Sequence, residues 1–322
     1  MKYIDSLKEG LNNLLKNDSK IILLGEDIGE PYGGAFRVTK GLSSRYPKQV
    51  ISTPMSESAL TGIAVGMALN GYKPILEIMF GDFITLCADQ IINHASKFPF
   101  LFGKDINMVI RTPMGGYRGY GATHSQSLEK MYFGIPNVTI FAPNILGNPG
   151  ELLEQAIGYK SLVLFIENKL DYFRGLIRCL DDKYIISRDN IHNIVEVRIR
   201  GEDDFAGSII TYGGMVKMAL EIIEQVKSLK LIVPSIISPI NKYILEMIGK
   251  NRVFPRDIYV LEEGIKEGGF GAEIARLLLE NNIKIRRFKI FAAKNEAIGA
   301  SKNLESYVLP NRDNIIRQIK GG

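Results

Sequence analysis

The stretch TPMSESALTGIAVGMALNGYKPILEIMF, residues 53–80, decides the fold of this chain. Pro54 ends a short strand, and residues 58–69 then place small side chains among large apolar ones, which is typical of a helix packed closely on a sheet. The following apolar run, residues 73–80, predicts a buried parallel strand. A strand, a helix and a second strand in this order indicate an α/β fold.

The same alternation continues on both sides of this stretch. In the first half, the pattern predicts strands at 21–25, 50–53, 106–114, 138–143 and 161–168, and helices at 7–15, 82–98 and 149–159. In the second half, it predicts strands at 208–213, 229–235, 257–264 and 283–290, and helices at 215–229, 239–250, 271–282 and 311–319. We therefore expect two α/β domains, residues 1–185 and 206–322, each a mostly parallel sheet flanked by helices. Residues 186–205 are expected to form a linker with an edge strand.

The composition limits the class of protein. Of the 322 residues, 46% are hydrophobic and 23% are charged, which is ordinary for a globular protein. The net charge is +5, but lysine and arginine are scattered, so we expect neither nucleic acid nor a membrane as a partner. Cys87 and Cys179 do not have the spacing of a disulfide framework or a metal site, and the N-terminus does not resemble a signal peptide. These features fit a reducing, cytoplasmic setting.

Polar residues follow the expected strands at one edge of the first sheet. The loops after the first four strands along the chain contain Glu26, Glu57, Asp82 and His124. Because ligands of parallel sheets bind outside the carboxyl ends of the strands, these residues predict a polar site at that edge.

Glu57 and His124 are the main candidates for chemistry. Glu57 lies at the start of a helix that follows a strand. A carboxylate there can complement the helix dipole, or it can bond a nitrogen atom of a ligand. The sequence pattern leaves both roles open. His124 lies in the glycine-rich segment GYGATHSQS, which favours acid–base work at a ligand edge. The other two histidines are expected to be structural, at His94 in a helix, and solvent-facing, at His192 in the linker.

Several ordered segments together resemble the β subunit of the 2-oxo acid dehydrogenase E1 component, of the pyruvate and branched-chain type. In the first domain they are LLGEDIGEPYGGAFRVTKGL (23–42), the opening stretch 53–80, GATHSQS (121–127) and LVLFIENKLDY (162–172). In the second domain they are ITYGGMV (210–216) and VLEEGIKEGGFGAEIA (260–275). The resemblance implies a pyrimidine-type thiamine-diphosphate-binding domain followed by a transketolase C-terminal-like domain.

The resemblance also implies roles for single residues. Glu57 aligns with the glutamate that bonds the aminopyrimidine ring of thiamine diphosphate, and His124 aligns with a histidine that assists the substrate or the acyl acceptor. Phe83 aligns with an aromatic residue that packs on the aminopyrimidine ring, and plain core packing is compatible with this role. Glu26 and Met79, on neighbouring strand ends, are further cofactor-binding candidates. The implied reaction is the decarboxylation of a 2-oxo acid with transfer of the acyl unit to a lipoyl group or another acceptor.

The resemblance implies a second chain as well. The family binds Mg²⁺ and the diphosphate of the cofactor through a GDG…N motif, whereas this chain has only Gly81–Asp82, in another context. We expect no metal ligands in this chain. An E1 α subunit is expected to supply them, with the site at the α/β interface of an α2β2 heterotetramer. A lipoyl E2 is a further expected partner, although LIVPSIISPIN (231–241) replaces a DLRTL-like segment common in the family and leaves the acceptor open.

Two alternatives remain open from the sequence. The chain could be the C-terminal half of a split transketolase, which a cluster of phosphate-binding arginine and histidine residues would favour. Only Arg111, Arg118 and one histidine lie near the expected site. It could also be a non-catalytic partner subunit that keeps the fold, but the presence of Glu57, Phe83 and His124 argues against this. The identity of the 2-oxo acid does not follow from the sequence.

Overall fold

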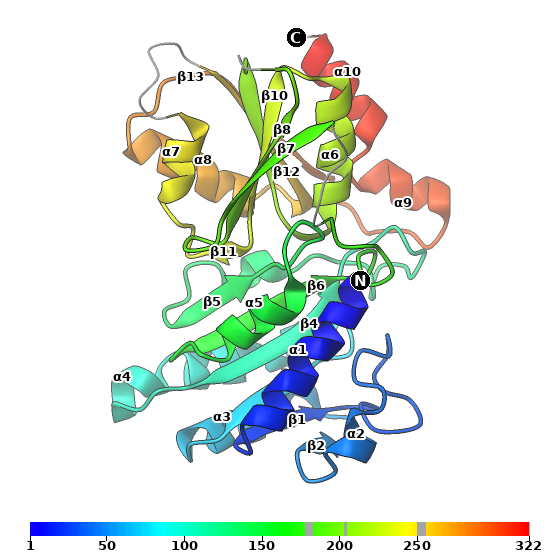
Figure 1. The fold of residues 1–322 in the computed structure, drawn as a ribbon, viewed down its shortest axis with the longest axis vertical. Coiled ribbons are helices and arrows are strands. Elements are labelled where there is room, and N and C mark those ends of the chain that lie inside the picture. Colours follow the sequence, from blue (N-terminus) through cyan, green and yellow to red (C-terminus); the bar gives the residue numbers. More distant parts are fainter. Residues whose placement is uncertain (178–182, 203–204, 250–255, 322) are drawn as a thin grey trace.

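The computed structural model describes residues 1–177, 183–202, 205–249 and 256–321, which form two domains placed one above the other in Figure 1. The first domain contains α1 (Tyr3–Asn17), β1 (Ile21–Gly25), α2 (Leu42–Arg45), β2 (Val50–Ser52), α3 (Glu57–Leu69), β3 (Lys73–Glu77), η1 (Gly81–Cys87), η2 (Gln90–Ala95), α4 (Phe98–Phe102), β4 (Met108–Met114), η3 (Glu129–Tyr132), β5 (Val138–Phe141), α5 (Pro149–Ala156) and β6 (Leu162–Asn168). The remaining elements are β7 (Tyr184–Asp189), β8 (Ile194–Ile199), β9 (Gly207–Thr211), η4 (Gly213–Met215), α6 (Val216–Gln225), β10 (Leu229–Pro234), β11 (Ile236–Ser238), α7 (Tyr243–Ile248), β12 (Arg256–Ile265), α8 (Phe270–Glu280), β13 (Ile285–Ala293), α9 (Lys302–Val308) and α10 (Arg312–Lys320). Cys179 lies outside the described residues.

The first sheet has seven strands in the order β11-β5-β6-β4-β3-β1-β2. Strands β1 to β6 are parallel, and β11 pairs antiparallel with β5 at one edge. Side chains alternate between the two faces of the sheet, so that Ile21 and Leu23 pack with α1 and α5 whereas Ile22 and Leu24 pack with α3. Figure 1 shows α1 and α5 side by side across one face. This sheet confirms the predicted α/β domain.

The second sheet has six strands in the order β13-β12-β9-β10-β8-β7. Strands β13, β12, β9 and β10 are parallel, β8 is antiparallel to β10, and β7 is antiparallel to β8. The edge strand expected in residues 186–205 corresponds to β7, which lies at the edge of the second sheet. The sequence did not predict β8, which pairs with β7 in a hairpin where a linker was expected. Its strand β8 contains Glu196, which is buried against Lys230 at 2.7 Å, and this buried charge obscures the apolar pattern. Residues 203–204 of that segment lie outside the described residues.

The single helix expected at residues 82–98 is wrong. The chain instead forms a 3₁₀ helix, η1, followed by a π-helix, η2, and the short α4. The carboxylate of Asp82 accepts hydrogen bonds from the backbone and side chain of Gln126, at 3.3 and 2.9 Å. Gly81 lies against Met114 so closely that a Cβ atom there would be 2.0 Å from its side chain. Contacts with the end of β4 and the loop after it therefore override the helical periodicity of this segment.

Hydrogen bonds of a buried carboxylate join the two domains. Glu263 of β12 accepts hydrogen bonds from the backbone N–H of Gly116 and from the side-chain amide of Asn168, the latter at 2.8 Å. Gly115 has a φ of +98°, and a Cβ atom there would lie 2.7 Å from this carboxylate, so the position requires glycine. Burial raises the pKa of Glu263 to about 7. The second domain is thus bonded directly to the loop that follows β4.

A buried ion cluster ties three neighbouring strands of the first sheet together. The guanidinium of Arg111 in β4 donates two hydrogen bonds of 2.8 Å to Glu167 in β6 and also contacts the carboxylate of Glu77 in β3. The hydroxyl of Tyr172 donates to Glu167 at 2.6 Å. Arg111 is only 1% exposed, so its removal leaves two buried carboxylates without a counter-charge.

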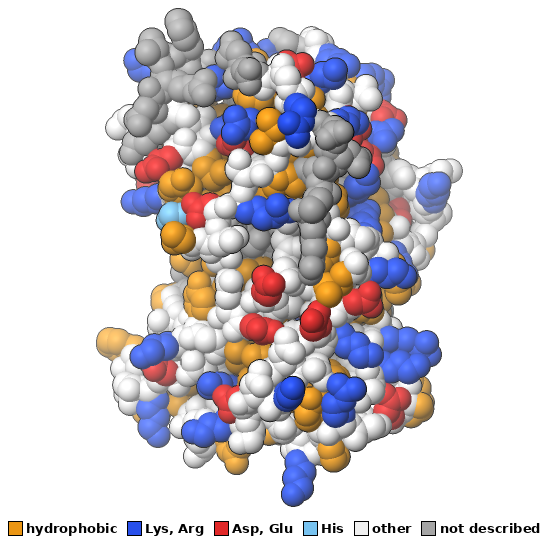
Figure 2. All heavy atoms as spheres, viewed as in Figure 1, with side chains coloured by type: hydrophobic (Ala, Val, Ile, Leu, Met, Phe, Trp, Pro, Cys, Tyr) orange, Lys and Arg blue, Asp and Glu red, His pale blue; other side chains and the backbone are white. Residues whose placement is uncertain are grey.

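Among the described residues, no helix has both the length and the apolar character to cross a bilayer. Figure 2 shows that lysine and arginine side chains on this face are spread over both domains.

Replacement of Arg111 by methionine is expected to destabilise the chain by about 3–5 kcal/mol, because it leaves Glu77 and Glu167 unpaired in the core. The free energy of unfolding in urea measures this loss. Arg276→Met on α8 is the control, since this half-exposed arginine pairs only with surface glutamates and should cost less than about 1 kcal/mol. Equal losses for the two variants would contradict the structural role of the cluster.

Replacement of Glu263 by glutamine is expected to flatten the pH dependence of stability. The pKa of Glu263 rises on folding from 4.5 to about 7, so its contribution is complete below about pH 4.5 and is lost as the pH rises to about 7. Glutamine mimics the protonated carboxyl and does not titrate. The measurement is the free energy of unfolding of both proteins from about pH 4 to 8, with exposed Glu246→Gln as control. Parallel curves for wild type and Glu263→Gln would refute this assignment.

Candidate active site

The carboxyl ends of β1 and β2 bring two glutamates together. Glu26 follows β1 directly, and Glu57 is the first residue of α3, which follows β2. A carboxylate oxygen of Glu26 accepts a hydrogen bond of 3.1 Å from the backbone N–H of Ser56. Burial, and next the negative charge of Glu57, raise the pKa of Glu26. Glu57 is half-buried, and Ser56 and Ser58 on either side of it are exposed, so its carboxylate lies at the surface of the single chain.

A buried cysteine connects Glu57 to the aromatic residues that follow β3. The Sγ atom of Cys87 lies 3.7 Å from the carbonyl oxygen of Glu57 and 3.9 Å from that of Phe83. Burial raises the pKa of Cys87 to about 12, so the thiol stays protonated and can donate to these oxygens. The start of α3 and the turn of η1 are therefore held against each other.

The ring of His124 lies against two phenylalanines. It meets Phe80 and Phe83 edge to face, with ring centroids 4.8 and 5.3 Å apart. The Nδ1 atom of His124 is 2.9 Å from the hydroxyl of Thr123. A hydroxyl that donates to Nδ1 leaves the ring proton on Nε2, where it can be exchanged with a bound molecule. The histidine is thus placed beside an aromatic wall with one ring nitrogen oriented by a neighbour.

Glu26, Glu57, Phe83 and His124 thus all lie at the carboxyl edge of the first sheet, and we call these four residues the row. Met79 follows β3 at the same edge and is half-buried.

The other two histidines have contacts elsewhere. His94 in η2 lies against the ring of Phe98, with centroids 5.4 Å apart. His192 stacks on Tyr243 with centroids 4.3 Å apart and pairs with Asp189 at 2.7 Å, so it is less solvent-facing than the sequence indicated.

Lys169 is a site residue that sequence reasoning missed. It follows β6 directly and is completely buried, and its ammonium donates a hydrogen bond to the carbonyl oxygen of His124. The rings of Phe80 and Tyr120 lie 5.5 and 5.6 Å from its Nζ atom. Burial lowers the pKa of Lys169 to about 8. The rule that found His124 also applies here, since Lys169 follows a buried parallel strand at the same edge.

Exposed apolar side chains surround this edge on the first domain. Met55, just before α3, is 77% exposed. Ile63 in α3 and Leu86 in η1 are each 55% exposed. At the opposite end of the sheet, α4 precedes the start of β4, and its Phe100 is 87% exposed. Figure 2 shows hydrophobic side chains at the corner where α4 projects in Figure 1.

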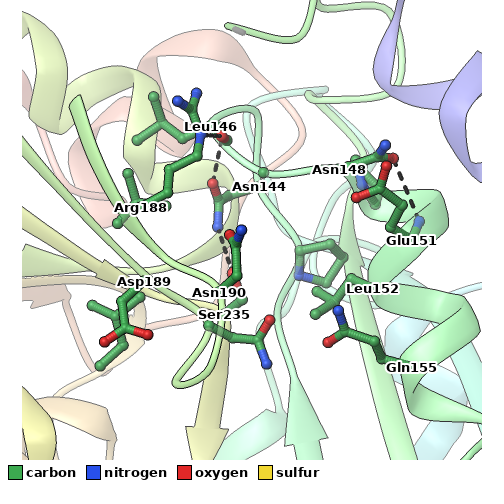
Figure 3. A pocket seen from close by; sticks show the side chains of 16 residues that line it. Asn144, Leu146, Asn148, Glu151, Leu152, Gln155, Arg188, Asp189, Asn190 and Ser235 are labelled. Carbon is green, nitrogen blue, oxygen red and sulfur yellow. Dashed lines mark hydrogen bonds between the residues drawn. The ribbon is translucent and has the colours of Figure 1, made fainter.

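A cavity of about 440 Å³ lies elsewhere, between α5 and the hairpin of β7 and β8 (Figure 3). Its lining mixes apolar side chains such as Leu146 and Leu152 with polar ones such as Asn144 and Arg188. Figure 3 shows Asn144 and Arg188 beside Leu146, with Glu151 and Gln155 on the opposite wall. The residues of the row at the carboxyl edge do not line this cavity, so the row is a separate site.

Comparisons with known proteins match both domains. The family model described as the transketolase pyrimidine binding domain matches residues 1–174, and the model described as the transketolase C-terminal domain matches residues 197–315. A solved split gene transketolase, described as an inactive β4 tetramer, covers 100% of this chain and 97% of its own with a TM-score of 0.72. At 18% identity this likeness shows the fold alone.

Curated relatives resemble the chain over almost its full length. The mitochondrial pyruvate dehydrogenase E1 component subunit beta-1 of Arabidopsis thaliana is 30% identical, over 99% of this chain and 88% of the relative. The 2-oxoisovalerate dehydrogenase subunit beta of Bacillus subtilis is 29% identical, over 98% and 96%. The pyruvate dehydrogenase E1 component subunit beta of Cyanidium caldarium is 31% identical, over 98% and 96%. With a pyrimidine-binding domain, a transketolase C-terminal domain and these relatives, the chain belongs to the family of 2-oxo acid dehydrogenase E1 β subunits.

Proposed function

We propose that this chain is the β subunit of a thiamine-diphosphate-dependent E1 enzyme that decarboxylates a 2-oxo acid and transfers the acyl unit onward. The observation that carries the proposal is the row of Glu26, Glu57, Phe83 and His124 at the carboxyl edge of the first sheet. Family membership supports the same reaction class.

The residues of the row fit the nitrogen-rich ring of this cofactor. Glu57 presents a half-buried carboxylate that can hold a proton at a ring nitrogen, and Glu26 fixes the preceding backbone through Ser56. Phe83 offers an aromatic surface for the flat ring, and Met79 lies at the same edge. When bound, thiamine diphosphate supplies the electron sink that allows a 2-oxo acid to lose carbon dioxide. His124 is placed to give or take a proton at the substrate or at the acyl acceptor.

An E1 α subunit is proposed to complete the site in an α2β2 heterotetramer. Glu57 is accessible from the surface of the single chain, and exposed apolar side chains such as Met55 and Ile63 lie beside it. Among the described residues, no group of three or more histidine, cysteine, aspartate or glutamate side chains could hold a metal ion. The resemblance to E1 β subunits supports the proposal that the α subunit holds Mg²⁺ and the diphosphate of the cofactor, and that a lipoyl E2 accepts the acyl unit.

The two alternatives are less well supported. The likeness to a split gene transketolase is one of fold, whereas the curated relatives over nearly the whole chain are E1 β subunits. A non-catalytic subunit has no need to keep Glu57 and His124 at one sheet edge with the contacts described above.

Replacement of Glu57 by glutamine is expected to lower turnover by about 10²–10⁴-fold, because glutamine cannot hold a carboxyl proton at the ring nitrogen. The measurement is dye reduction by the chain co-expressed with its α subunit, with Mg²⁺, thiamine diphosphate and a panel of 2-oxo acids. Glu151→Gln is a matched control, since Glu151 also lies in the first turn of a helix, α5. The Glu151→Gln variant also removes a negative charge near the start of a helix but leaves the residues of the row unchanged. It should keep wild-type activity. Full activity of Glu57→Gln would refute the proposed role.

Replacement of His124 by alanine is expected to slow acyl transfer by about 10²-fold or more while the Kd of thiamine diphosphate changes less than about threefold. The reason is that His124 faces Phe80 and Phe83 rather than the glutamate pair. Single-turnover acyl transfer and cofactor titration measure the two effects, with the partly exposed His94→Ala as control. A loss of cofactor affinity without slower transfer would contradict this role.

A further inference from the structure

The loop that carries His124 has little regular structure of its own. We call residues Gly115–Ser127, between β4 and η3, the histidine loop. Gly115, Tyr117, Gly119 and Gly121 all have positive φ angles, of 98°, 62°, 69° and 77°. Left-handed residues break regular hydrogen bonding, and Tyr117 adopts this conformation despite its side chain. The position of His124 therefore depends on contacts from outside the loop.

The first domain holds the loop from one side through Lys169. Its buried ammonium donates to the carbonyl oxygen of His124 itself, between the rings of Phe80 and Tyr120. The negative charge of Asp82 acts favourably on this ammonium, and the same carboxylate accepts hydrogen bonds from the backbone and side chain of Gln126 near the end of the loop. A buried ammonium without a hydrogen-bond acceptor is costly, so breaking its bond to the carbonyl oxygen of His124 is unfavourable. This bond therefore holds the backbone at His124 in place.

The second domain holds the loop from the other side through Glu305 of α9. Glu305 is 5% exposed, and its carboxylate accepts hydrogen bonds from the backbone N–H groups of Arg118 and Gly119, at 3.1 and 3.2 Å. The hydroxyl of Tyr117 donates to the carbonyl oxygen of Pro310 at 2.8 Å. Two consecutive N–H groups directed at one carboxylate are a strong, charge-assisted attachment.

We propose that Lys169 and Glu305 are positioning residues of the E1 reaction: from opposite sides, they hold the histidine loop so that His124 stays beside Phe80 and Phe83. The second domain then serves the active site by fixing a loop of the first domain. This inference rests on the proposed function of His124. Glu305 acts through the backbone N–H groups of Arg118 and Gly119.

The expected size of the effect follows from the geometry. A misplacement of about 1 Å of a reacting group can cost about 10²-fold in rate, even when the altered residue is far from the chemistry. Loss of the Glu305 carboxylate frees the amides of Arg118 and Gly119, five residues or more before His124. The chemical step should therefore slow, whereas substrate and cofactor affinity should change little.

The test compares Glu305→Ala, Glu305→Gln and Lys169→Met in the assembled complex with the α subunit. We expect kcat to fall about 10–100-fold for Glu305→Ala and Lys169→Met, with KM within about threefold of wild type. Amide hydrogen exchange in residues 115–127 should become about tenfold faster or more in the same variants. Glu305→Gln keeps an acceptor oxygen for the amides and should recover most of kcat and of the protection. Glu246→Ala, an exposed glutamate on α7, is the matched control and should match wild type.

The outcomes separate this inference from the proposed function. Suppose that the wild-type complex is active. The positioning role alone is then overturned if Glu305→Ala and Lys169→Met keep wild-type kcat. It is also overturned if they lose kcat without faster amide exchange in the histidine loop. Faster exchange over the whole chain would likewise overturn it, because it indicates general destabilisation. A wild-type complex inactive on every 2-oxo acid in the panel would overturn the proposed function, and the inference with it.

Discussion

The parallel alignment of the first sheet is the constraint on which the site depends. Because β1, β2, β3, β4 and β6 run in the same direction, the residues that follow them emerge at one edge although they are far apart in the sequence. Glu26, Glu57, Phe83, His124 and Lys169 each occupy such a position. The buried cluster of Arg111, Glu77 and Glu167 crosses three of these strands and fixes their register directly below this edge. A shift of one strand would therefore separate the carboxylates from the aromatic wall.

Buried carboxylates, in addition to apolar packing, link the second domain to this edge. Glu263 and Glu305 both bind backbone N–H groups of the loop after β4, and Tyr212 donates to Glu129 in η3. The side chains of Glu263, Glu305, Glu129 and Tyr212 are buried, so a carboxylate left without its partner there is costly. These hydrogen bonds add to the apolar packing and the β5–β11 pairing that join the two domains, and the loop that holds His124 takes part in them. This arrangement explains why a domain without residues in the row can still influence the site.

The sequence was sufficient for the fold class and for most of the row, and it failed where tertiary contacts override local pattern. Continuous apolar runs such as residues 21–25 and 161–168 identify buried parallel strands, and the edge rule then locates Glu57 and His124. Residues 82–98 have helical periodicity, but the contacts of Asp82 and Gly81 impose 3₁₀ and π turns. The paired charges of Glu196 and Lys230 hide β8 in a segment expected to be a linker. Glu305 has no local signal at all, because its role depends on a contact with a loop in the other domain.

The central claim is that the carboxylate of Glu57 bonds the aminopyrimidine ring of thiamine diphosphate in a cleft shared with an α subunit. The most direct measurement is an experimental structure of the assembled complex with the cofactor and Mg²⁺ bound. We expect a Glu57 oxygen within hydrogen-bond distance, about 2.6–3.2 Å, of a ring nitrogen, with the diphosphate held by the other subunit. A structure that places Glu57 on the outer surface, away from the cofactor and from the α/β interface, would contradict the account.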